Sequence, residues 1–412
     1  MNKAKITLLY ADEAGEIFDA PGISAMGRMG DENVVLRTKD LLPLPESADL
    51  MYLPDRMPLG QKNGETMPIS GQAVAALLPA GYTRLYMPAF QKSENAKVLP
   101  LYGYTAVALY KDEMYAAAVY TDKNDKWDPA RYNTENLPML IDRVKKDMPD
   151  NILVDHLANC SLQWHCCTAQ NLFYGRWEAG IPVSPVCNAA CLGCISLQAA
   201  ECCPSPQSRI KFSPSPETIA QIGTYHLSRA ADAIISFGQG CEGEPSLAVD
   251  NLVPALKMIR AHTDKGQINI NTNAGFTEGI ARLADAGLDS MRVSIISAVP
   301  ENYKAYYRCN YELADVIASI QYAKRKGVYI SLNMLYFPGF NDSKTESAAW
   351  RKFLRMAPVD MIQVRNLNID PDEFAKVMPQ FTPPLGTKMF FGGLKGEFPD
   401  ISIGSFSHYQ KE

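Results

Sequence analysis

The sequence lacks the features that place a chain in or across a membrane. Residues 1–6 contain no long apolar segment of the kind that forms a signal peptide. No apolar run approaches the roughly 18 residues that a membrane-spanning helix needs. A short run such as residues 74–78 is expected in a core helix instead. We therefore expect a cytoplasmic protein without membrane contact.

An excess of positive charge is also absent. The 40 Lys and Arg residues are outnumbered by 45 Asp and Glu residues, and the formal net charge is -5 at pH 7. Nucleic-acid binding usually requires a basic domain, so nucleic acid is not expected as a partner. The length of 412 residues predicts two domains, or one large barrel with an extension.

The first 135 or so residues contain neither cysteine nor histidine. Apolar and aromatic runs at residues 6–10, 34–37, 104–110 and 114–120 are typical of strands. We interpret residues 1–135 as an N-terminal, mainly β domain that serves as a scaffold or recognises substrate, because no catalytic motif occurs in it.

A helical linker is expected at residues 136–179. One helix is predicted to run from Asn136 to about residue 146, and a second from residue 150 to about 177. On the second helix, Cys160 and Cys167 share an apolar stripe, so burial explains them as well as metal ligation does. Cys166, beside His165, lies off that stripe.

Cysteine is concentrated in one part of the chain. Most of the ten cysteines lie between Cys160 and Cys203, and without a signal peptide they indicate metal binding or catalysis rather than disulfides. Cys187, Cys191 and Cys194 have the spacing C-x₃-C-x₂-C. Thiolates suit iron–sulfur clusters and zinc. A closed zinc site needs four ligands, so three thiols leave one coordination position open.

Strand and helix patterns alternate after the helical linker. The predicted strands are residues 180–185, 233–238, 267–271, 291–296, 329–337 and 361–367. The predicted helices between them are residues 251–260, 278–286, 311–326 and 344–356. Six strands with helical crossovers predict a parallel sheet curled into a barrel or partial barrel, with its site at the C-terminal ends of the strands.

The cysteine motif after a short strand resembles that of the radical S-adenosylmethionine (SAM) superfamily. The resemblance implies a [4Fe–4S] cluster on Cys187, Cys191 and Cys194, with SAM on the fourth iron. It also implies a partial (β/α)₆ barrel over residues 180–370. One electron, from a flavodoxin- or ferredoxin-type reductant, would cleave SAM to a 5′-deoxyadenosyl radical that abstracts hydrogen from substrate.

Several strand ends extend this resemblance. Gly243-Glu244-Pro245 resembles the superfamily's "GGE" segment, which holds the amino group of SAM, and Thr272-Asn273-Ala274 resembles another strand end near SAM. The implied SAM-binding residues are Gly240, Gly243, Glu244, Asn273, Arg292, Ser294 and Asn333. Asn269, Asn271 and Asn273 alternate along one strand, so they share a face and predict a polar cavity.

One position departs from the family pattern. The superfamily usually has an aromatic residue just before the third cysteine, where this chain has Gly193. The resemblance ends near residue 370. Residues 371–412 form a C-terminal extension without cysteine, and we expect its aromatic and glycine-rich tail, residues 388–409, to close the mouth of the barrel.

A second cluster is an open alternative. Cys160, Cys166, Cys167, Cys202 and Cys203, with His165, offer further ligands, and Cys241 is an unusual neighbour of the Gly243-Glu244 segment. We predict a single cluster, because no cysteine pair outside the core motif has C-x₂-C spacing.

Substrate, product and catalytic residues on the protein are not determined by the sequence. The substrate can be a small molecule, or a peptide or protein that is modified. The alternative to an enzyme is a non-catalytic iron–sulfur or zinc-binding protein.

Overall fold

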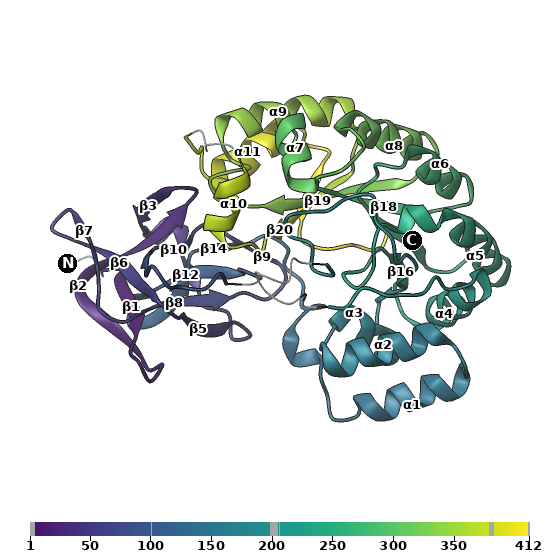
Figure 1. Cartoon of the computed structure of the whole chain (residues 1–412), viewed down its shortest axis with the longest axis horizontal. Helices are drawn as coiled ribbons and strands as arrows, with labels where there is room; N and C mark the ends of the chain where they lie inside the picture. The colour runs from purple at the N-terminus through teal and green to yellow at the C-terminus, as the bar shows by residue number, and fades with distance from the viewer. Residues whose placement is uncertain (1–4, 100, 198–204, 206, 379–382, 411–412) are drawn as a thin grey trace.

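The computed structural model describes residues 5–99, 101–197, 205, 207–378 and 383–410. Within these residues the N-terminal part is an antiparallel sheet of 12 strands, with the central order β11-β6-β2-β1-β8-β12-β13-β4. It occupies one end of the molecule (Figure 1). Two further short strands, β9 (Tyr82–Arg84) and β14 (Ala118–Tyr120), pair with each other.

The strands of the large antiparallel sheet are mostly short. They are β1 (Thr7–Ala11), β2 (Ile17–Met29), β3 (Glu32–Val35), β4 (Leu42–Pro43), β5 (Asp49–Leu53), β6 (Arg56–Lys62), β7 (Glu65–Pro68), β8 (Gln72–Leu77), β10 (Met87–Pro88), β11 (Phe90–Lys92), β12 (Tyr104–Tyr110) and β13 (Glu113–Ala116). The prediction of β structure in this part of the chain is therefore confirmed.

Two details of that prediction were wrong. Residues 74–77 belong to strand β8 and residue 78 follows it, so no helix forms here; β8 is paired with β1, β5 and β12 and is buried along most of its length. A strand buried on both faces has a continuous apolar sequence, which periodicity cannot distinguish from a core helix. Residues 114–120 are not one strand, since β13 ends at Ala116 and β14 begins in another sheet.

Three helices follow the antiparallel sheet: α1 (Leu137–Asp147), α2 (Ile152–Gln163) and α3 (Cys167–Tyr174). The single helix predicted for residues 150–177 is thus broken in two, and His165 at the break has φ +50°. Because α3 is a separate helix with its own axis, the apolar stripe predicted for residues 150–177 does not continue from Cys160 to Cys167. Cys160 is buried in the core, whereas Cys167 is only half-buried.

The C-terminal part is a parallel sheet of seven strands in sequential order, within the described residues. The strands are β15 (Glu178–Gly180), β16 (Ile234–Phe237), β17 (Gln267–Thr272), β18 (Ser290–Ile295), β19 (Tyr329–Tyr336), β20 (Met361–Asn366) and β21 (Ser402–Gly404). The connecting helices are α4 (Pro216–Arg229), α5 (Val249–His262), α6 (Thr277–Asp285), α7 (Pro300–Tyr307), α8 (Leu313–Arg325), α9 (Lys344–Met356), α10 (Pro371–Val377) and α11 (Thr387–Glu397). Figure 1 shows helices α4, α5, α6, α8 and α9 along the outside of this sheet.

The parallel sheet is curled but open, because β15 and β21 are its unpaired ends in the described residues. This architecture confirms the predicted fold class, a partial barrel of alternating strands and helices joined to a β-rich N-terminal part. The first strand was predicted too late and too long, because β15 ends at Gly180, where the predicted range of residues 180–185 begins. The seventh strand, β21, was not predicted.

The end of the C-terminal tail lies at the N-terminal ends of the parallel strands, opposite the predicted position at the mouth of the barrel. The backbone N–H of Gln410 donates to Oε1 of Gln267, the first residue of β17 (3.1 Å). Phe406 packs with Trp177 and with Ile234, the first residue of β16. The tail therefore covers the N-terminal ends of these strands, the floor of the barrel, and not its mouth as we had expected.

The antiparallel sheet and the barrel are joined by buried hydrogen bonds. The Asn366 side chain, at the end of β20, accepts from the Arg84 backbone N–H (3.0 Å) and donates to the Tyr82 carbonyl (3.0 Å). The buried Arg84 guanidinium donates to the carbonyl groups of Tyr102 and Leu367. The domain boundaries at residues 135, 179 and 370 stay predictions. Among the described residues, no helix is long and apolar enough to cross a membrane.

Candidate functional site

The C-terminal ends of β15 and β16 are joined by the buried carboxylate of Glu242. Its Oε2 accepts the N–H groups of Val183 (2.7 Å) and Ser184 (3.0 Å), and its Oε1 accepts those of Gly238 (2.7 Å) and Gln239 (2.6 Å). These bonds take the N–H groups of Val183 and Ser184 out of the sheet ladder, which explains why β15 is shorter than predicted. Burial raises the pKa of Glu242 to about 7, although the four N–H donors act in the opposite direction.

Gly243 allows the loop after β16 to lie directly on the segment that leads into the cysteine motif. Its N–H donates to the Ser184 carbonyl (2.7 Å), and the N–H of Glu244 donates to the Val186 carbonyl (2.8 Å). A Cβ atom at Gly243 would lie 1.9 Å from the Val186 oxygen. Glycine is therefore required here for close backbone approach.

The cysteine loop itself is held by the C-terminal end of α7. The backbone N–H of Ala190 donates to the Tyr307 carbonyl and that of Leu192 donates to the Tyr306 carbonyl, both at 2.9 Å. A Cβ atom at Gly193 would lie 2.8 Å from the Tyr306 hydroxyl oxygen. The buried Tyr306 ring thus lies against the position where the family pattern has its aromatic residue.

The three predicted ligand thiols are free and half-buried. Burial raises the pKa of Cys187 and of Cys191. Cys194 differs, because its Sγ lies 3.6 Å from Nη2 of Arg209 and 3.7 Å from the Ser196 hydroxyl. The three sulfur atoms do not all lie within 4.8 Å of one another, so their spacing does not suit a single metal ion.

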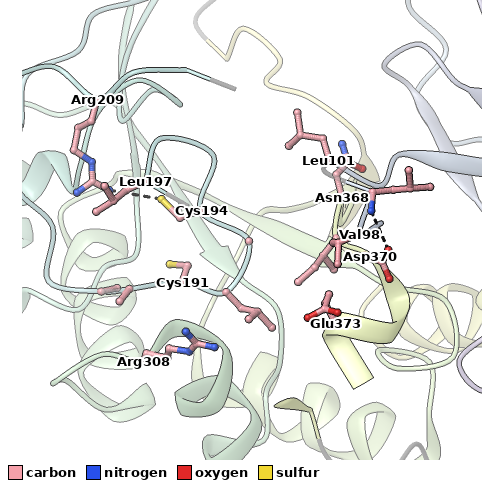
Figure 2. A pocket seen from close by; sticks show the side chains of 16 residues that line it. Val98, Leu101, Cys191, Cys194, Leu197, Arg209, Arg308, Asn368, Asp370 and Glu373 are labelled. Atoms are coloured by element: carbon pink, nitrogen blue, oxygen red, sulfur yellow. Dashed lines mark hydrogen bonds between the residues drawn. The ribbon is translucent and has the colours of Figure 1, made fainter. Parts of the chain in front are cut away.

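A cavity of about 380 Å³ lies beside the loop. Figure 2 shows Cys191 and Cys194 on one side of it and Val98, Leu101 and Glu373 of α10 on the other. Arg209 and Arg308 line it near the thiols, while Asp370 and Glu373 line the opposite side (Figure 2). The cavity gives a ligand of small-molecule size access to two of the three thiols.

Glu244 is buried with one acceptor position left over. Its Oε1 accepts from the N–H of Ser246 (3.0 Å) and from the Thr272 hydroxyl, and its Oε2 accepts from the N–H of Asn273 (2.8 Å). Burial raises its pKa. A carboxylate offers about four lone-pair sites, so Oε2 keeps one for a further donor such as an ammonium group.

Asn273 connects the end of β17 to the cysteine loop. Its Nδ2 donates to Oδ1 of Asn188 (2.6 Å), next to Cys187, and its backbone N–H is bonded to Glu244. The structure thus brings Gly243, Glu244 and Asn273 together beside the loop, as the sequence suggested. Gly240 lies nearby on the same loop as Gly243, where a Cβ atom would contact the Ile195 side chain at 2.4 Å.

The other three predicted cofactor residues lie on the inner face of β18 and β19. Ser294 and Asn333 are in register, and Nδ2 of Asn333 donates to the Ser294 hydroxyl (3.3 Å). Oδ1 of Asn333 is buried and has no hydrogen-bond partner among the described residues. Arg292 lies deeper, where its Nη1 donates to Gln363 (3.2 Å) and to Ser407 of the tail (3.1 Å). It is therefore placed apart from Glu244 and Asn273.

A second, inner cavity of about 190 Å³ is lined by Ala80, Trp127, Thr168, Glu178, Gln239, Arg292 and Arg365. Arg292 Nη2 lies 4.0 Å from Glu178 Oε1, and Arg365 has no hydrogen bond or ion pair within the described part of the chain. Burial, followed by the neighbouring Arg292, lowers the pKa of Arg365 to about 10, so it stays protonated at neutral pH. The charged side chains that line the cavity are two guanidinium groups and the carboxylate of Glu178, and the carboxylate of Asp122, outside the lining, also acts on Arg365.

The asparagine row of β17 has the predicted orientation. Nδ2 of Asn269 donates to Oδ1 of Asn271 (2.8 Å), and Nδ2 of Asn271 donates to the Gly238 carbonyl (3.2 Å). These residues share one face, but they are bonded to one another and to neighbouring strands. Their side chains are therefore already bonded, whereas Arg365 on β20 has no hydrogen bond or ion pair within the described residues.

The remaining cysteines divide into separate groups. Cys202 and Cys203 lie outside the described residues. His165 is bonded to Asn133 (2.9 Å), and neither it nor Cys167 belongs to any group of three possible metal ligands that the described residues form. Such a group does exist at His156, Cys160 and Cys241.

Sequence reasoning missed Glu242, Arg365 and His156. Glu242 lies between Cys241 and Gly243, and only the other acid of this segment, Glu244, matches the family pattern. Arg365 is on a predicted strand, but only the curl of the sheet brings it near Arg292. His156 and Cys160 are four residues apart on one helix face, which is a detectable signal.

Comparison with known proteins gave a family-model match over part of the chain and a set of similar solved structures. The family model of the radical SAM superfamily matches residues 181–349. No curated protein sequence matches the chain. Among solved structures, the chain is similar to HydG, a maturase of the [FeFe]-hydrogenase, with 15% identity over 68% of this chain and 67% of that chain and a TM-score of 0.38. It is also similar to methylornithine synthase (PylB), with 14% identity over 64% and 78% and a TM-score of 0.39. A third is Streptococcus suis SuiB bound to precursor peptide SuiA, with 12% identity over 61% and 52% and a TM-score of 0.39. TM-scores this low add nothing to the argument about function.

Gly243→Ala should disrupt the contact between the two loops. A Cβ atom 1.9 Å from a backbone oxygen forces the loops apart, so we expect a loss of unfolding free energy of about 1–3 kcal/mol or more. Gly392→Ala is the matched control, since no atom lies within 4 Å of its Cβ position inside α11, and it should stabilise by about 0.5–1 kcal/mol. Denaturant unfolding measures both, and equal stabilities for the two variants would contradict the close approach.

Proposed function

We propose a function on the premise that residues 181–349 belong to the radical SAM superfamily. Membership of this superfamily implies an enzyme that cleaves SAM at an iron–sulfur cluster. The finer proposal is that Cys187, Cys191 and Cys194 hold one [4Fe–4S] cluster and that the residues around Glu244 hold SAM. When bound and reduced by a flavodoxin- or ferredoxin-type donor, these cofactors supply a 5′-deoxyadenosyl radical that abstracts hydrogen from substrate.

The single observation that carries the proposal is the geometry of the cysteine loop. Three free thiols lie on one loop, spread more widely than a single ion needs, and two of them line a cavity. The Arg209 guanidinium donates to the sulfur of Cys194, and the Ser196 hydroxyl lies 3.7 Å from the same sulfur. These residues fit a cluster that keeps one position open better than they fit a structural zinc site, which needs four ligands.

For SAM, the proposal rests on acceptor groups that the chain leaves available. Glu244 keeps one lone pair on Oε2 and is fixed in place by Asn273, which also contacts the cysteine loop. We propose that Glu244 accepts the ammonium group of SAM, with Gly240 and Gly243 providing the close backbone surface. Ser294 and the unpartnered Oδ1 of Asn333 are proposed to contact the same molecule farther along the sheet.

A non-catalytic iron–sulfur or zinc protein is the rival function. A purely structural metal site would leave no use for the cavity beside Cys191 and Cys194, or for the buried acceptor on Asn333. The enzyme is therefore preferred, and cleavage of SAM by the reduced protein separates the two functions. A reduced protein that keeps its iron but does not cleave SAM would support the non-catalytic function.

Replacing Cys187, Cys191 and Cys194 together by alanine should remove about four irons per chain, because one [4Fe–4S] cluster would lose its ligands. The measurement is iron and sulfide content of anaerobically prepared protein. Cys167→Ala is the control, since its thiol is outside the loop and should leave the iron unchanged. Full iron content in the triple variant would show that other residues hold the cluster, and about eight irons in the wild type would show a second one.

Glu244→Gln should weaken SAM binding by about 1.5–3 kcal/mol, because it removes a charged acceptor while keeping the side chain's size. Iron content should not change. Glu346→Gln is the matched control, since Glu346 is another buried carboxylate with three donors from Ser297, Ala298 and Asn302. Anaerobic titration with SAM measures the affinity. The same affinity in both variants would remove Glu244 from the SAM site.

For the substrate, we propose a molecule with an anionic group that enters the inner cavity. Arg365 lines this cavity beside Arg292 and makes no hydrogen bond or ion pair within the described residues, so its guanidinium donors are available, and an arginine pair suits a carboxylate or phosphate. No residue of the cysteine loop lines this cavity, so the anion is assigned to substrate rather than to SAM. A small acid fits about 190 Å³, and of a peptide only an acidic side chain or terminus would fit.

Arg365→Met should abolish stabilisation by small acids. We expect acetate or phosphate to raise the melting temperature of the wild type and of the control Arg355→Met, whose arginine is on the surface, but not of Arg365→Met. Scanning fluorimetry measures this shift. If Arg365→Met weakens SAM binding instead, the anion is the carboxylate of SAM. If no acid gives a shift that depends on Arg365, the substrate proposal fails.

A further inference from the structure

A second group of metal-ligating side chains lies away from the cysteine loop. The ligand atoms of His156, Cys160 and Cys241 all lie within 4.8 Å of one another. Nε2 of His156 is 3.4 Å from Sγ of Cys160. Cys160 and Cys241 are 2% and 5% exposed, and both are free thiols. The group is thus buried and available for coordination.

Two separate segments build this group. Asn151 caps α2 by accepting the N–H groups of Leu153 and Val154, which fixes the start of the helix. His156 and Cys160 follow at a spacing of four, so they share one helix face. Cys241 comes from the loop after β16, where its carbonyl accepts the N–H of Ile210 (2.8 Å).

The distances match a single ion. With metal–sulfur bonds of about 2.3 Å and metal–nitrogen bonds of about 2.0–2.1 Å, the ligand atoms of a tetrahedral zinc site are about 3.5–3.8 Å apart. The His156–Cys160 distance of 3.4 Å is just below this edge length. The cysteine loop behaves differently, because its three sulfur atoms are spread beyond 4.8 Å. The ligand atoms of His156, Cys160 and Cys241 are spaced for a single ion, and the thiols of the cysteine loop are not.

We propose that His156, Cys160 and Cys241 bind one divalent metal ion of the zinc class. Two thiolates and an imidazole are the ligand set that zinc prefers. Cys166 is a candidate for the fourth position, since its N–H donates to the Cys160 carbonyl (3.1 Å), and a water is the alternative there. This proposal is independent of the radical SAM function, because none of its residues belongs to the cysteine loop.

The ion would connect α2 to the loop that contains Glu242 and Glu244. That loop is already attached to the barrel through bonds of Glu242, Gly243 and Glu244. A metal bond at Cys241 would fix its other side to a helix outside the barrel. The ion is therefore structural, and its removal should lower the melting temperature while the iron of the cysteine loop remains.

Elemental analysis of the holoprotein tests the site. The wild type, and the variant with Cys187, Cys191 and Cys194 replaced by alanine, should each contain about one zinc per chain. His156→Gln and Cys241→Ser should lose it. Cys167→Ser is the matched control and should keep it, since Cys167 is on the adjacent helix but outside the group. His156 is only half-buried, so His156→Gln keeps the test valid if Cys241→Ser fails to fold.

Cobalt provides a second measurement. After chelation, Co²⁺ added to the wild type and to Cys167→Ser should give the visible bands of a tetrahedral site and thiolate charge-transfer absorption in the near ultraviolet. Neither should appear in His156→Gln. Equal zinc in Cys241→Ser and the wild type, or no thiolate–cobalt absorption in any protein, would overturn the site. Loss of about four irons in Cys160→Ser would show that these residues hold a second iron–sulfur cluster and not a single ion.

Discussion

The arrangement of the candidate site depends on one buried carboxylate. Glu242 accepts four backbone N–H groups, two from the segment after β15 and two from the segment after β16. A buried carboxylate is costly unless its lone pairs are filled, and here all of them are. The bonds fix two strand ends that carry different chemistry. One leads into the cysteine loop, and the other carries Glu244.

Three ligand sites of different size surround this carboxylate. The cysteine loop spreads its thiols and borders a cavity, which suits a cluster with an open position. The group of His156, Cys160 and Cys241 has the dimensions of one ion. Inside the barrel, Arg292 and Arg365 provide positive charge for an anion. Because the tail covers the floor of the barrel, the inner cavity is closed on that side.

Sequence patterns predicted most of the barrel, since its strands and helices alternate with clear periodicity. Helix α9 (Lys344–Met356) occurs at the predicted residues. The failures have local causes. Residues 74–78 were assigned to a helix because a doubly buried strand lacks alternation, and the helix over residues 150–177 is broken at His165. Strand β21 has only three residues, too few for a pattern, and is a strand only because β20 lies beside it.

The sequence by itself determined the cysteine motif, the barrel fold class and the neighbourhood of Gly243 and Glu244, because each depends on residues close together in the chain. Contacts between distant residues were decided by the tertiary structure alone. Cys160, which the sequence placed on an apolar stripe, lies against Cys241 because α2 packs beside the end of β16. Arg292 faces the inner cavity with Arg365, away from Glu244, because the curl of the sheet sets which strand positions meet. Periodicity gives the face on which a side chain lies, but only folding determines what lies opposite.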